Sequence, residues 1–530
     1  ISPTKNKTIT IANLSSFSDE VIEALRIALK HKDNLPYIYN LANGKAINGK
    51  IYGSVLCLYQ VAGYTQLRKI LGNSRYADLC LWLVMSRFLG SSSRLSSVRL
   101  ASIHAACEVI GIDSLTEDDL YEAMDWLAEN KLTIEKRLFT NWKQTSPNAT
   151  SREHIFLYDL SSSYLEGEKN ELACYGYNRD KKKGKKIITY GLLTDKDGYP
   201  LGIEVFPGNT SDNKTVQTQI AKIKNDYQAK YITFVGDKGM IKSGEQSVIG
   251  DEGFHYITSI TKREINTLLA NKTIDMSLFD NDVSEVKDIE NNVRYILRRN
   301  PMRAEELKRS RSEKILYIEH KIAQSNAYLS QHPKAKVEVQ IRNIQNCIIK
   351  LKLQDIVIIE QANNDRIISL YIDEDTLPEK SKLDGCYVIK TDILDEAIDK
   401  EIIHDRYKDL FFVEMAFKEG KSILNARSIY VIKKNKTIAH VFITMLAYLL
   451  EWHLRKIWKN IDLTPIEAIE TLKQIGSQVI QIGQTKIISI VKPTGICKEL
   501  LEKAQVIIPE KLPYVEVDVH TNRKLPSRRK

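Results

Sequence analysis

The sequence predicts an α/β protein: a mixed five-stranded sheet with flanking helices, interrupted by an insertion and preceded by a helical region. Three observations predict this fold. Runs rich in strand-forming residues begin near residue 154, amphipathic helical patterns fill the chain before that point, and a long charged segment separates the strands from a second helical region. With 530 residues, the chain is long enough for two to four such regions.

The first region, residues 1–150, is expected to be all-helical. Apolar residues recur there at three- and four-residue spacing, which is typical of helices with one buried face. Ser and Thr stand at helix starts, where a side-chain oxygen can accept a hydrogen bond from a free backbone N–H. Four stretches carry the pattern: DEVIEALRIALK, YADLCLWLVMSRFL, LASIHAACEVI and EDDLYEAMDWLAENKLTIEKRLF.

Residues 151–264 carry the strand patterns. Short connections join the first three strands, and the turn DKDGYP lies between the second and third, so these strands are expected to be antiparallel. Longer crossovers precede the last two strands, which favours a course parallel to the first. In chain order the runs are IFLYDL, KIITYGLLT, PLGIEVFP, the helix KTVQTQIAKIKNDY, YITFVGD and FHYITSIT.

Residues 265–400 interrupt this pattern and are expected to form an insertion domain. They contain a charged helical pair broken near Pro333 and two strand-like runs, DIVIIEQ and GCYVIKT. Helical periodicity returns across 401–480, which predicts a second part of the core, and 481–530 is expected to form a basic tail.

Composition limits the partners and the compartment. A formal net charge of +10 favours an anionic partner without identifying one. Seven scattered cysteines, none in a CxxC pair, argue for a reducing compartment and against a zinc finger or a disulfide framework. The apolar run IAHVFITMLAYLL is shorter than a bilayer crossing, so we expect a core helix, no membrane partner and a cytoplasmic location.

Two carboxylates stand at strand ends. Asp159 closes the first strand run and Asp237 closes YITFVGD. If the two strands are neighbours, these carboxylates meet at one sheet edge, where unit charges 4 Å apart repel by about 4 kcal/mol. A divalent cation would offset that cost, and oxygen ligands without Cys or His suit Mg²⁺ or Mn²⁺. Either aspartate alone is more often a turn or loop residue.

A third carboxylate is expected from a helix, and Glu414 is the best candidate. On a helix it shares one face with Tyr407 and Lys421, among aromatic and apolar neighbours that are unusual for a charge. Lys418 and Lys421 lie one and two turns further on, where a phosphate could be held. The plain alternative for Glu414 is a solvated helix residue.

At these residues the sequence resembles the DDE transposases of bacterial insertion sequences. One branch carries a Tyr-x2-Arg-x3-Glu-x6-Lys signature on the glutamate helix; Tyr407, Glu414 and Lys421 match it, whereas Leu410 replaces the arginine. The resemblance starts at about residue 45 and points to the longer subgroup with a large insertion before the glutamate. Further motifs are DLYEAMDWL, LYDLSSSYLEG, YGYNRD, GLLTDKDGYPLGIEVFPGNTSD, VGDKGM and AHVFITMLAYLLEWHLR.

The resemblance implies an RNase H-like core in which Asp159, Asp237 and Glu414 are catalytic and hold two Mg²⁺ (or Mn²⁺) ions. One ion would activate a water or a DNA 3′-hydroxyl, and the other would stabilise the leaving oxygen. The chain would cut transposon ends and join the 3′ ends to target DNA. Its implied partners are double-stranded DNA, at terminal inverted repeats and target sites, and a second copy of itself, since synapsis of two ends needs a homodimer.

The helical region is expected to bind the terminal repeats, and the protein to associate with the nucleoid. Candidate DNA contacts are basic or hydroxyl side chains near the motifs: Tyr407, Lys418, Lys421, Arg87, Arg94, Arg99, Lys182, Lys183, Arg528 and Arg529. Each basic cluster has a plain alternative as a solvated loop, a polar helix junction or a solubilising tail. Phe279, Tyr295 or Tyr317 are candidates to stack on a flipped base. The rival functions are a metal-dependent nuclease without strand transfer and a DNA-binding protein without catalysis.

Overall fold

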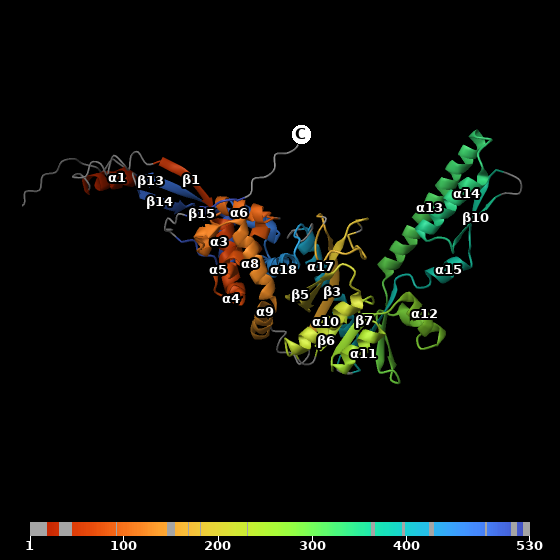
Figure 1. The fold of residues 1–530 in the computed structure, drawn as a ribbon. Helices are drawn as coiled ribbons and strands as arrows, with labels where there is room; N and C mark the ends of the chain where they lie inside the picture. The colour runs from red at the N-terminus through yellow and green to blue at the C-terminus, as the bar shows by residue number, and fades with distance from the viewer. Residues whose placement is uncertain are drawn as a thin grey trace, which may run out of the picture. The chain divides into compact units, whose positions relative to one another are not determined.

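The computed structural model describes most of the chain, which divides into two compact units. Unit 1 comprises Ile1–Asn141, Lys169–Glu171 and Glu419–Lys530, and unit 2 comprises Trp142–Glu168 and Leu172–Lys418 (Figure 1). The described residues are 18–30, 45–91, 93–145, 154–167, 169–180, 182–229, 232–361, 366–394, 398–422, 429–482, 485–509 and 517–522.

Unit 2 is built on an eight-stranded mixed sheet in the order β5-β4-β3-β6-β7-β12-β9-β8. Its first five strands are those that the sequence predicts: β3 (His154–Tyr164), β4 (Ile187–Asp195), β5 (Pro200–Pro207), β6 (Ile232–Gly236) and β7 (His255–Ser259). The predicted directions are confirmed, because β3–β4 and β4–β5 are antiparallel whereas β3–β6 and β6–β7 are parallel. Helices α10 (Asp212–Asn225) and α11 (Ser243–Asp251) form the crossovers.

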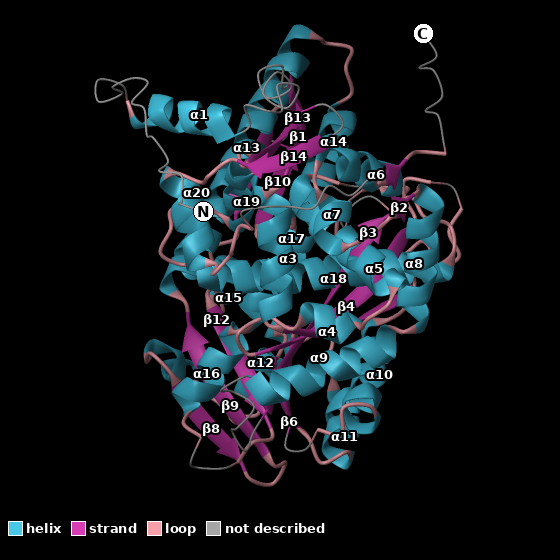
Figure 2. Cartoon of the chain, turned by 90° about the vertical axis from the view of Figure 1, so that its left-hand side faces the viewer, coloured by secondary structure: helices cyan, strands magenta, loops and turns pink. Residues whose placement is uncertain are grey.

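Three further strands correct the expected five-stranded sheet. They are β8 (Ser284–Asp288), β9 (Val293–Arg299) and β12 (Cys386–Thr391), all from the segment expected to be a separate insertion. The strand β12 pairs antiparallel with β7 and β9, and β8 pairs antiparallel with β9. Figure 2 shows β8 and β9 side by side. This pairing satisfies the backbone groups that β7 would otherwise expose as an edge strand.

A hydrophobic cluster covers these added strands. It contains residues of α12 (Lys262–Ala270), of η3 (Met276–Asp280) and of the strands themselves. Phe279 is 1% exposed and Tyr295 is 8% exposed within it. Because both rings are packed inside a core, the expectation that either stacks on a base is wrong for this conformation.

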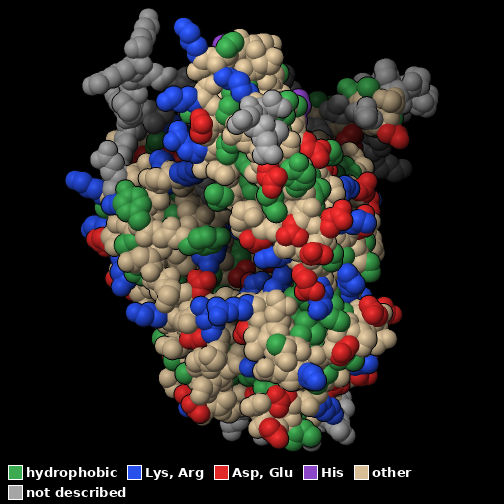
Figure 3. All heavy atoms as spheres, turned by 90° about the vertical axis from the view of Figure 1, so that its right-hand side faces the viewer, with side chains coloured by type: hydrophobic (Ala, Val, Ile, Leu, Met, Phe, Trp, Pro, Cys, Tyr) green, Lys and Arg blue, Asp and Glu red, His purple; other side chains and the backbone are tan. Residues whose placement is uncertain are grey.

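The rest of the insertion is a helical hairpin, α13 (Pro301–Gln331) and α14 (Val337–Leu351), that extends from the sheet of unit 2 (Figure 1). The expected break near Pro333 is confirmed, and Asn300 caps α13 with Pro301 in its first turn. Ile318, Ile322 and Ile344 pack with β10 (Val357–Gln361) and β11 (Ile368–Ile372) in a small core of their own, followed by α15 (Thr376–Ser381). Basic and acidic side chains are interspersed on the face seen in Figure 3.

Unit 1 is mainly helical but combines both ends of the chain. The predicted helical stretches are present, yet residues 1–150 also contain two strands, so this region is not all-helical. Strand β1 pairs antiparallel with β13, and β2 pairs parallel with β15. In chain order the elements are α1 (Asp19–Lys30), β1 (Lys45–Ile51), α3 (Gly53–Tyr64), α4 (Leu67–Leu71), α5 (Arg75–Ser86), η1 (Arg87–Leu89), α6 (Arg94–Ile103), α7 (Ala106–Ile110), β2 (Ser114–Leu115), α8 (Glu117–Glu129), α9 (Lys131–Thr145), α18 (Lys434–Ile457), α19 (Pro465–Leu472), β13 (Gly476–Ile482), β14 (Thr485–Ile490), α20 (Gly495–Lys503) and β15 (Asp518–Val519).

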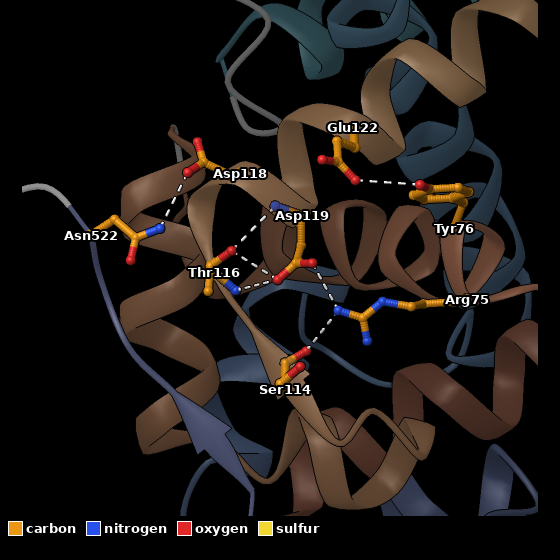
Figure 4. A network of polar contacts seen from close by, with 8 residues as sticks. All are labelled: Arg75, Tyr76, Ser114, Thr116, Asp118, Asp119, Glu122 and Asn522. Atoms are coloured by element: carbon orange, nitrogen blue, oxygen red, sulfur yellow. Dashed lines mark hydrogen bonds and ion pairs between the residues drawn. The ribbon is translucent and has the colours of Figure 1, made fainter.

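A polar network fixes the start of α8 (Figure 4). Thr116 and Asp119 form a capping box, in which each side chain accepts a backbone N–H of the other residue. Arg75 pairs with Asp119 at 2.8 Å, and Asn522 donates to Asp118 at 3.2 Å. The described end of the chain is thereby tied to the amino-terminal helices, while Arg528 and Arg529 lie outside the described residues.

The helix α18 forms the core of unit 1, as expected for the run IAHVFITMLAYLL. It packs on α3, α5 and α8 and is buried along most of its length. Among the described residues it is the one helix long and apolar enough to cross a membrane, a property that a buried core helix shares. Arg87 and His440 meet inside this core, with Nη2 and Nδ1 separated by 3.1 Å.

Arg87 and Arg94 are therefore core residues of unit 1, each 5% exposed. Burial, followed by the charge of Arg94, lowers the pKa of Arg87 to about 9. A guanidinium enclosed in this way has no surface on which to meet a DNA phosphate. The expectation that these two residues contact DNA is revised accordingly, whereas Arg99 of the same segment is exposed.

A carboxylate pair at the end of α18 predicts a pH dependence of unit 1. Burial and the neighbouring Glu419 raise the pKa of Glu451 to about 8, and Arg455 pairs with both carboxylates. A raised pKa means that the folded state holds a proton that the unfolded state releases, so stability declines as the pH rises from about 5 to about 8. In Glu451→Gln, thermal melts across this range should show a smaller decline. Glu499→Gln, at an exposed position on α20, should keep the wild-type slope.

Candidate active site

The parallel strands of unit 2 place two aspartates at the same level of the sheet. The β3–β6 register pairs Leu157 with Val235, so Asp159 and Asp237 each stand two residues beyond this pair. Strand β3 continues past Asp159, whose side chain is half-buried, whereas β6 ends at Gly236 and leaves Asp237 exposed in the following loop. The expectation that these carboxylates come from neighbouring strands agrees with this register.

Two successive helices bring the third carboxylate. The helix α16 (Lys400–Lys408) packs on β6, β7 and β9 and carries Tyr407, and α17 (Leu410–Ser422) carries Glu414. The sequence predicts one continuous helix here, but Asp409 forms a turn between the two. Tyr407 and Glu414 nevertheless both line one cavity, together with Asp159 of β3 and Asp237 after β6.

This cavity has a volume of about 590 Å³ and lies entirely within unit 2. Asp159, Asp237 and Glu414 all line it. Three lysines that the sequence did not single out line it as well: Lys238, Lys262 and Lys408. Acidic and basic side chains therefore line the same cavity, an arrangement that suits a phosphodiester bound to a metal ion.

The three carboxylates influence one another electrostatically. Burial raises the pKa of Asp159 to about 7, and the charges of Glu414 and Asp237 contribute to the rise. The N–H of Leu160 and the charge of Arg179 oppose it. Among the described residues, no three His, Cys, Asp or Glu side chains stand close enough together to hold a metal ion as they are. The donor set consists of carboxylate oxygens, which fits a hard divalent cation that would offset their mutual repulsion.

A hydroxyl chain orients Asp237. Tyr407 Oη donates to Ser259 Oγ at 2.8 Å, and Ser259 Oγ lies 3.5 Å from Asp237 Oδ1. Burial raises the pKa of Tyr407 to about 12, and the charges of Asp237 and Glu414 add to the rise. The sequence led us to expect that Tyr407 contacts DNA. In the structure its hydroxyl group donates a hydrogen bond to Ser259, a residue that the sequence did not indicate. The available signal was its place in the sheet, because the strand register puts Ser259 of β7 at the same level as Asp159 and Asp237.

The other predicted contacts are not among the residues that line the cavity. Lys418 is exposed at the end of unit 2, whereas Lys421 belongs to unit 1 and is 8% exposed. Lys182 and Lys183 are exposed on the connection between β3 and β4. Leu410, which stands in place of the signature arginine, lines the cavity with its apolar side chain.

The chain is similar to one known protein family. A family model described as "Transposase DDE domain" matches residues 150–450, more than half of the chain. The match spans Asp159, Asp237 and Glu414. No curated protein matches the chain.

Among solved structures, a piggyBac transposase in a synaptic complex with hairpin DNA is similar at 8% identity and a TM-score of 0.37, covering 81% of each chain. This likeness is too distant to carry an argument. Because the family model alone extends over more than half of the sequence, the chain belongs to the family of transposases with a DDE domain.

Proposed function

We propose that the chain cuts DNA at the ends of a transposon and joins the freed 3′ ends to target DNA, as a transposase of the insertion-sequence branch. The observation that carries the proposal is that Asp159, Asp237 and Glu414 line one cavity together with three lysines. The strand order β5-β4-β3-β6-β7, with β4 antiparallel to β3, supports an RNase H-like core. Tyr407, Glu414 and Lys421 support the assignment to the branch.

In this proposal Asp159, Asp237 and Glu414 hold two divalent ions, Mg²⁺ or Mn²⁺. When bound there, such ions would activate the attacking water or 3′-hydroxyl and would stabilise the leaving oxygen. Lys238, Lys262 and Lys408 attract the phosphates on either side of the scissile bond. The hydroxyls of Tyr407 and Ser259 keep Asp237 oriented toward the cavity.

DNA is held outside the cavity by exposed basic side chains, among which Arg99, Lys182 and Lys183 are available in the described residues. Two copies of the chain act together, since joining requires two transposon ends to be brought side by side. The place of action is the cytoplasm, at the nucleoid, where the DNA substrate lies.

A strand-transfer assay tests this function. The full chain is incubated with Mg²⁺, a plasmid target and a labelled, pre-cut transposon end carrying a free 3′-hydroxyl. A transposase yields joined product that disappears when EDTA is added. Fragments without joined product would favour a metal-dependent nuclease on the same core, and binding without any cleavage would favour a DNA-binding protein.

Ser259→Ala should weaken catalysis moderately. The hydrogen bond from Ser259 to the Asp237 carboxylate is long, at 3.5 Å, so we expect its loss to cost only about 0.5–1.5 kcal/mol. This predicts a cleavage rate about 2- to 10-fold lower, together with weaker Mn²⁺ binding measured by calorimetry. Tyr407→Phe should give a similar loss, and the double variant should lose little more because both hydroxyls act through Asp237. Ser247→Ala, at an exposed position on α11, is the matched control. Strictly additive losses would show that the two hydroxyls act separately.

A further inference from the structure

The segment Tyr175-Gly176-Tyr177 packs closely against the sheet of unit 2. Cys174 and Ile187 exchange two backbone hydrogen bonds, at 3.1 and 2.9 Å. A Cβ atom added to Gly176 would lie 2.0 Å from the carbonyl oxygen of Gly208, and one added to Gly208 would lie 2.0 Å from that of Ile187. Both positions therefore require glycine, and the backbone between the two tyrosines is held tightly in place.

The two tyrosines beside Gly176 are turned to solvent. Tyr175 is 68% exposed and Tyr177 is 81% exposed. Large exposed rings on a tightly held backbone are unusual, because an aromatic ring ordinarily gains stability by burial. Two rings on one rigid segment present flat apolar faces, and the segment has little conformational freedom to lose on binding.

Each ring has a cation beside it. Lys186 Nζ lies 5.8 Å from the centroid of the Tyr175 ring, and Arg179 Cζ lies 5.7 Å from that of Tyr177. Arg179 also donates to both carboxylate oxygens of Asp212, at 3.1 and 3.2 Å, which fixes its position. Rings for stacking and cations for phosphates are the two components of surfaces that hold single-stranded nucleic acid.

The same segment is joined to the candidate active site. The backbone N–H of Arg179 donates to Ser162 Oγ at 3.2 Å, and Ser162 stands three residues beyond Asp159 on β3. Asp212, the partner of Arg179, has its Oδ2 3.8 Å from where a Cβ on Gly239 would stand, in the loop after Asp237. The segment that carries the tyrosines is thus connected to strand β3, which contains Asp159, and lies near the loop that contains Asp237.

We propose that Tyr175 and Tyr177 form a stacking platform for unpaired nucleotides of a DNA strand that enters or leaves the candidate active site. The bases of an intact duplex have no free faces, so the platform engages a strand that is locally unpaired. This inference rests on the proposed function only in taking DNA as the substrate. It assigns the stacking role to residues outside the insertion, where the sequence had suggested Phe279, Tyr295 or Tyr317.

Equilibrium binding of the full chain tests the platform. Fluorescence anisotropy is measured in EDTA with a labelled oligothymidylate of about 12 nucleotides and with an abasic strand of the same length. Replacing both tyrosines by Ala should weaken oligothymidylate binding at least about fivefold, the loss expected for one stacked base, and leave abasic binding unchanged. Replacing both by Phe should retain wild-type affinity. Tyr371→Ala, at a 53% exposed position on β11, is the matched control.

Equal affinity of the Ala and wild-type proteins for oligothymidylate overturns the proposal, and so does an equal loss with the abasic strand. Photo-crosslinking of the wild-type chain to 5-iodouracil DNA needs no variant, so it decides the question even if the Ala protein misfolds. Crosslinked peptides should contain Tyr175 or Tyr177, and crosslinks confined to other segments overturn the proposal. Because EDTA prevents metal-dependent cleavage, failure here leaves the strand-transfer result, and with it the proposed function, unaffected.

Discussion

Asp237→Asn should lower Mg²⁺-dependent cleavage of a transposon end by about 10³-fold or more while leaving the affinity for the end unchanged. The amide keeps the shape of the carboxylate but lacks its charge, and the loss of a metal ligand removes several kcal/mol of charge stabilisation from the transition state. DNA affinity should persist because the phosphate contacts come from basic side chains. The exposed position of Asp237 in its loop means that folding is not at risk.

The measurement compares initial cleavage rates with binding isotherms for the same labelled end. Asp251→Asn, at the exposed end of α11, changes the same charge outside the cavity and should leave both quantities at their wild-type values. Glu414→Gln should lower the cleavage rate as much as Asp237→Asn is expected to, since both side chains line the same cavity. Cleavage that survives either substitution would remove the proposed carboxylate trio as the catalytic centre.

The first five strands of unit 2 could be predicted because their signals are local. Each is a short run of strand-forming residues, turn residues bound the antiparallel ones, and crossover length sets the direction of the others. Once the order is known, Asp159 and Asp237 fall on one edge through the register of β3 and β6. The same reasoning applied to β7 would have included Ser259.

The addition of β12, β9 and β8 to the sheet could not be predicted in the same way. Thr391 pairs with Ile257 across more than one hundred residues, and no local pattern encodes such a partner. The pairing of β1 with β13 in unit 1 is equally non-local. For this reason sequence periodicity indicates the elements of an insertion but not the sheet to which they belong.

The expectation that Arg87 and Arg94 contact DNA failed for a different reason. Serines and arginines close together in a sequence indicate a polar surface, yet here both arginines are buried and the serines bond to one another inside unit 1. Ser97 Oγ lies 3.2 Å from Ser86 Oγ and 2.7 Å from Ser91 Oγ, and the Ser97 carbonyl accepts a hydrogen bond from Trp82. Composition cannot distinguish a solvated hydroxyl cluster from a buried one whose partners lie on adjacent helices.

Arg294 shows how the insertion returns the chain to the candidate site. This residue of β9 is 2% exposed, and its Nε donates to Glu285 of β8 at 2.6 Å. The same guanidinium donates to the carbonyl oxygens of Ile393 and Ile398, at 3.0–3.1 Å. These carbonyls lie on the connection from β12 to α16, the helix that carries Tyr407. One buried side chain therefore joins two inserted strands to the segment that leads into α16 and α17.

Arg294→Met should destabilise unit 2 by about 3 kcal/mol or more. The substitution leaves the partly buried Glu285 carboxylate, the buried carbonyl of Ile393 and the half-buried carbonyl of Ile398 without this donor. Removal of one partner from a buried ion pair typically costs about 3–5 kcal/mol, and here the guanidinium is the buried partner. Denaturant unfolding followed by fluorescence measures the loss. Arg303→Met breaks an exposed pair with Glu306 on α13 and should cost no more than about 1 kcal/mol. Cleavage by Arg294→Met should fall together with stability, because the segment that leads into α16 and α17 loses its hydrogen bonds to Arg294. A variant that is stable but inactive would instead place Arg294 in the chemistry itself.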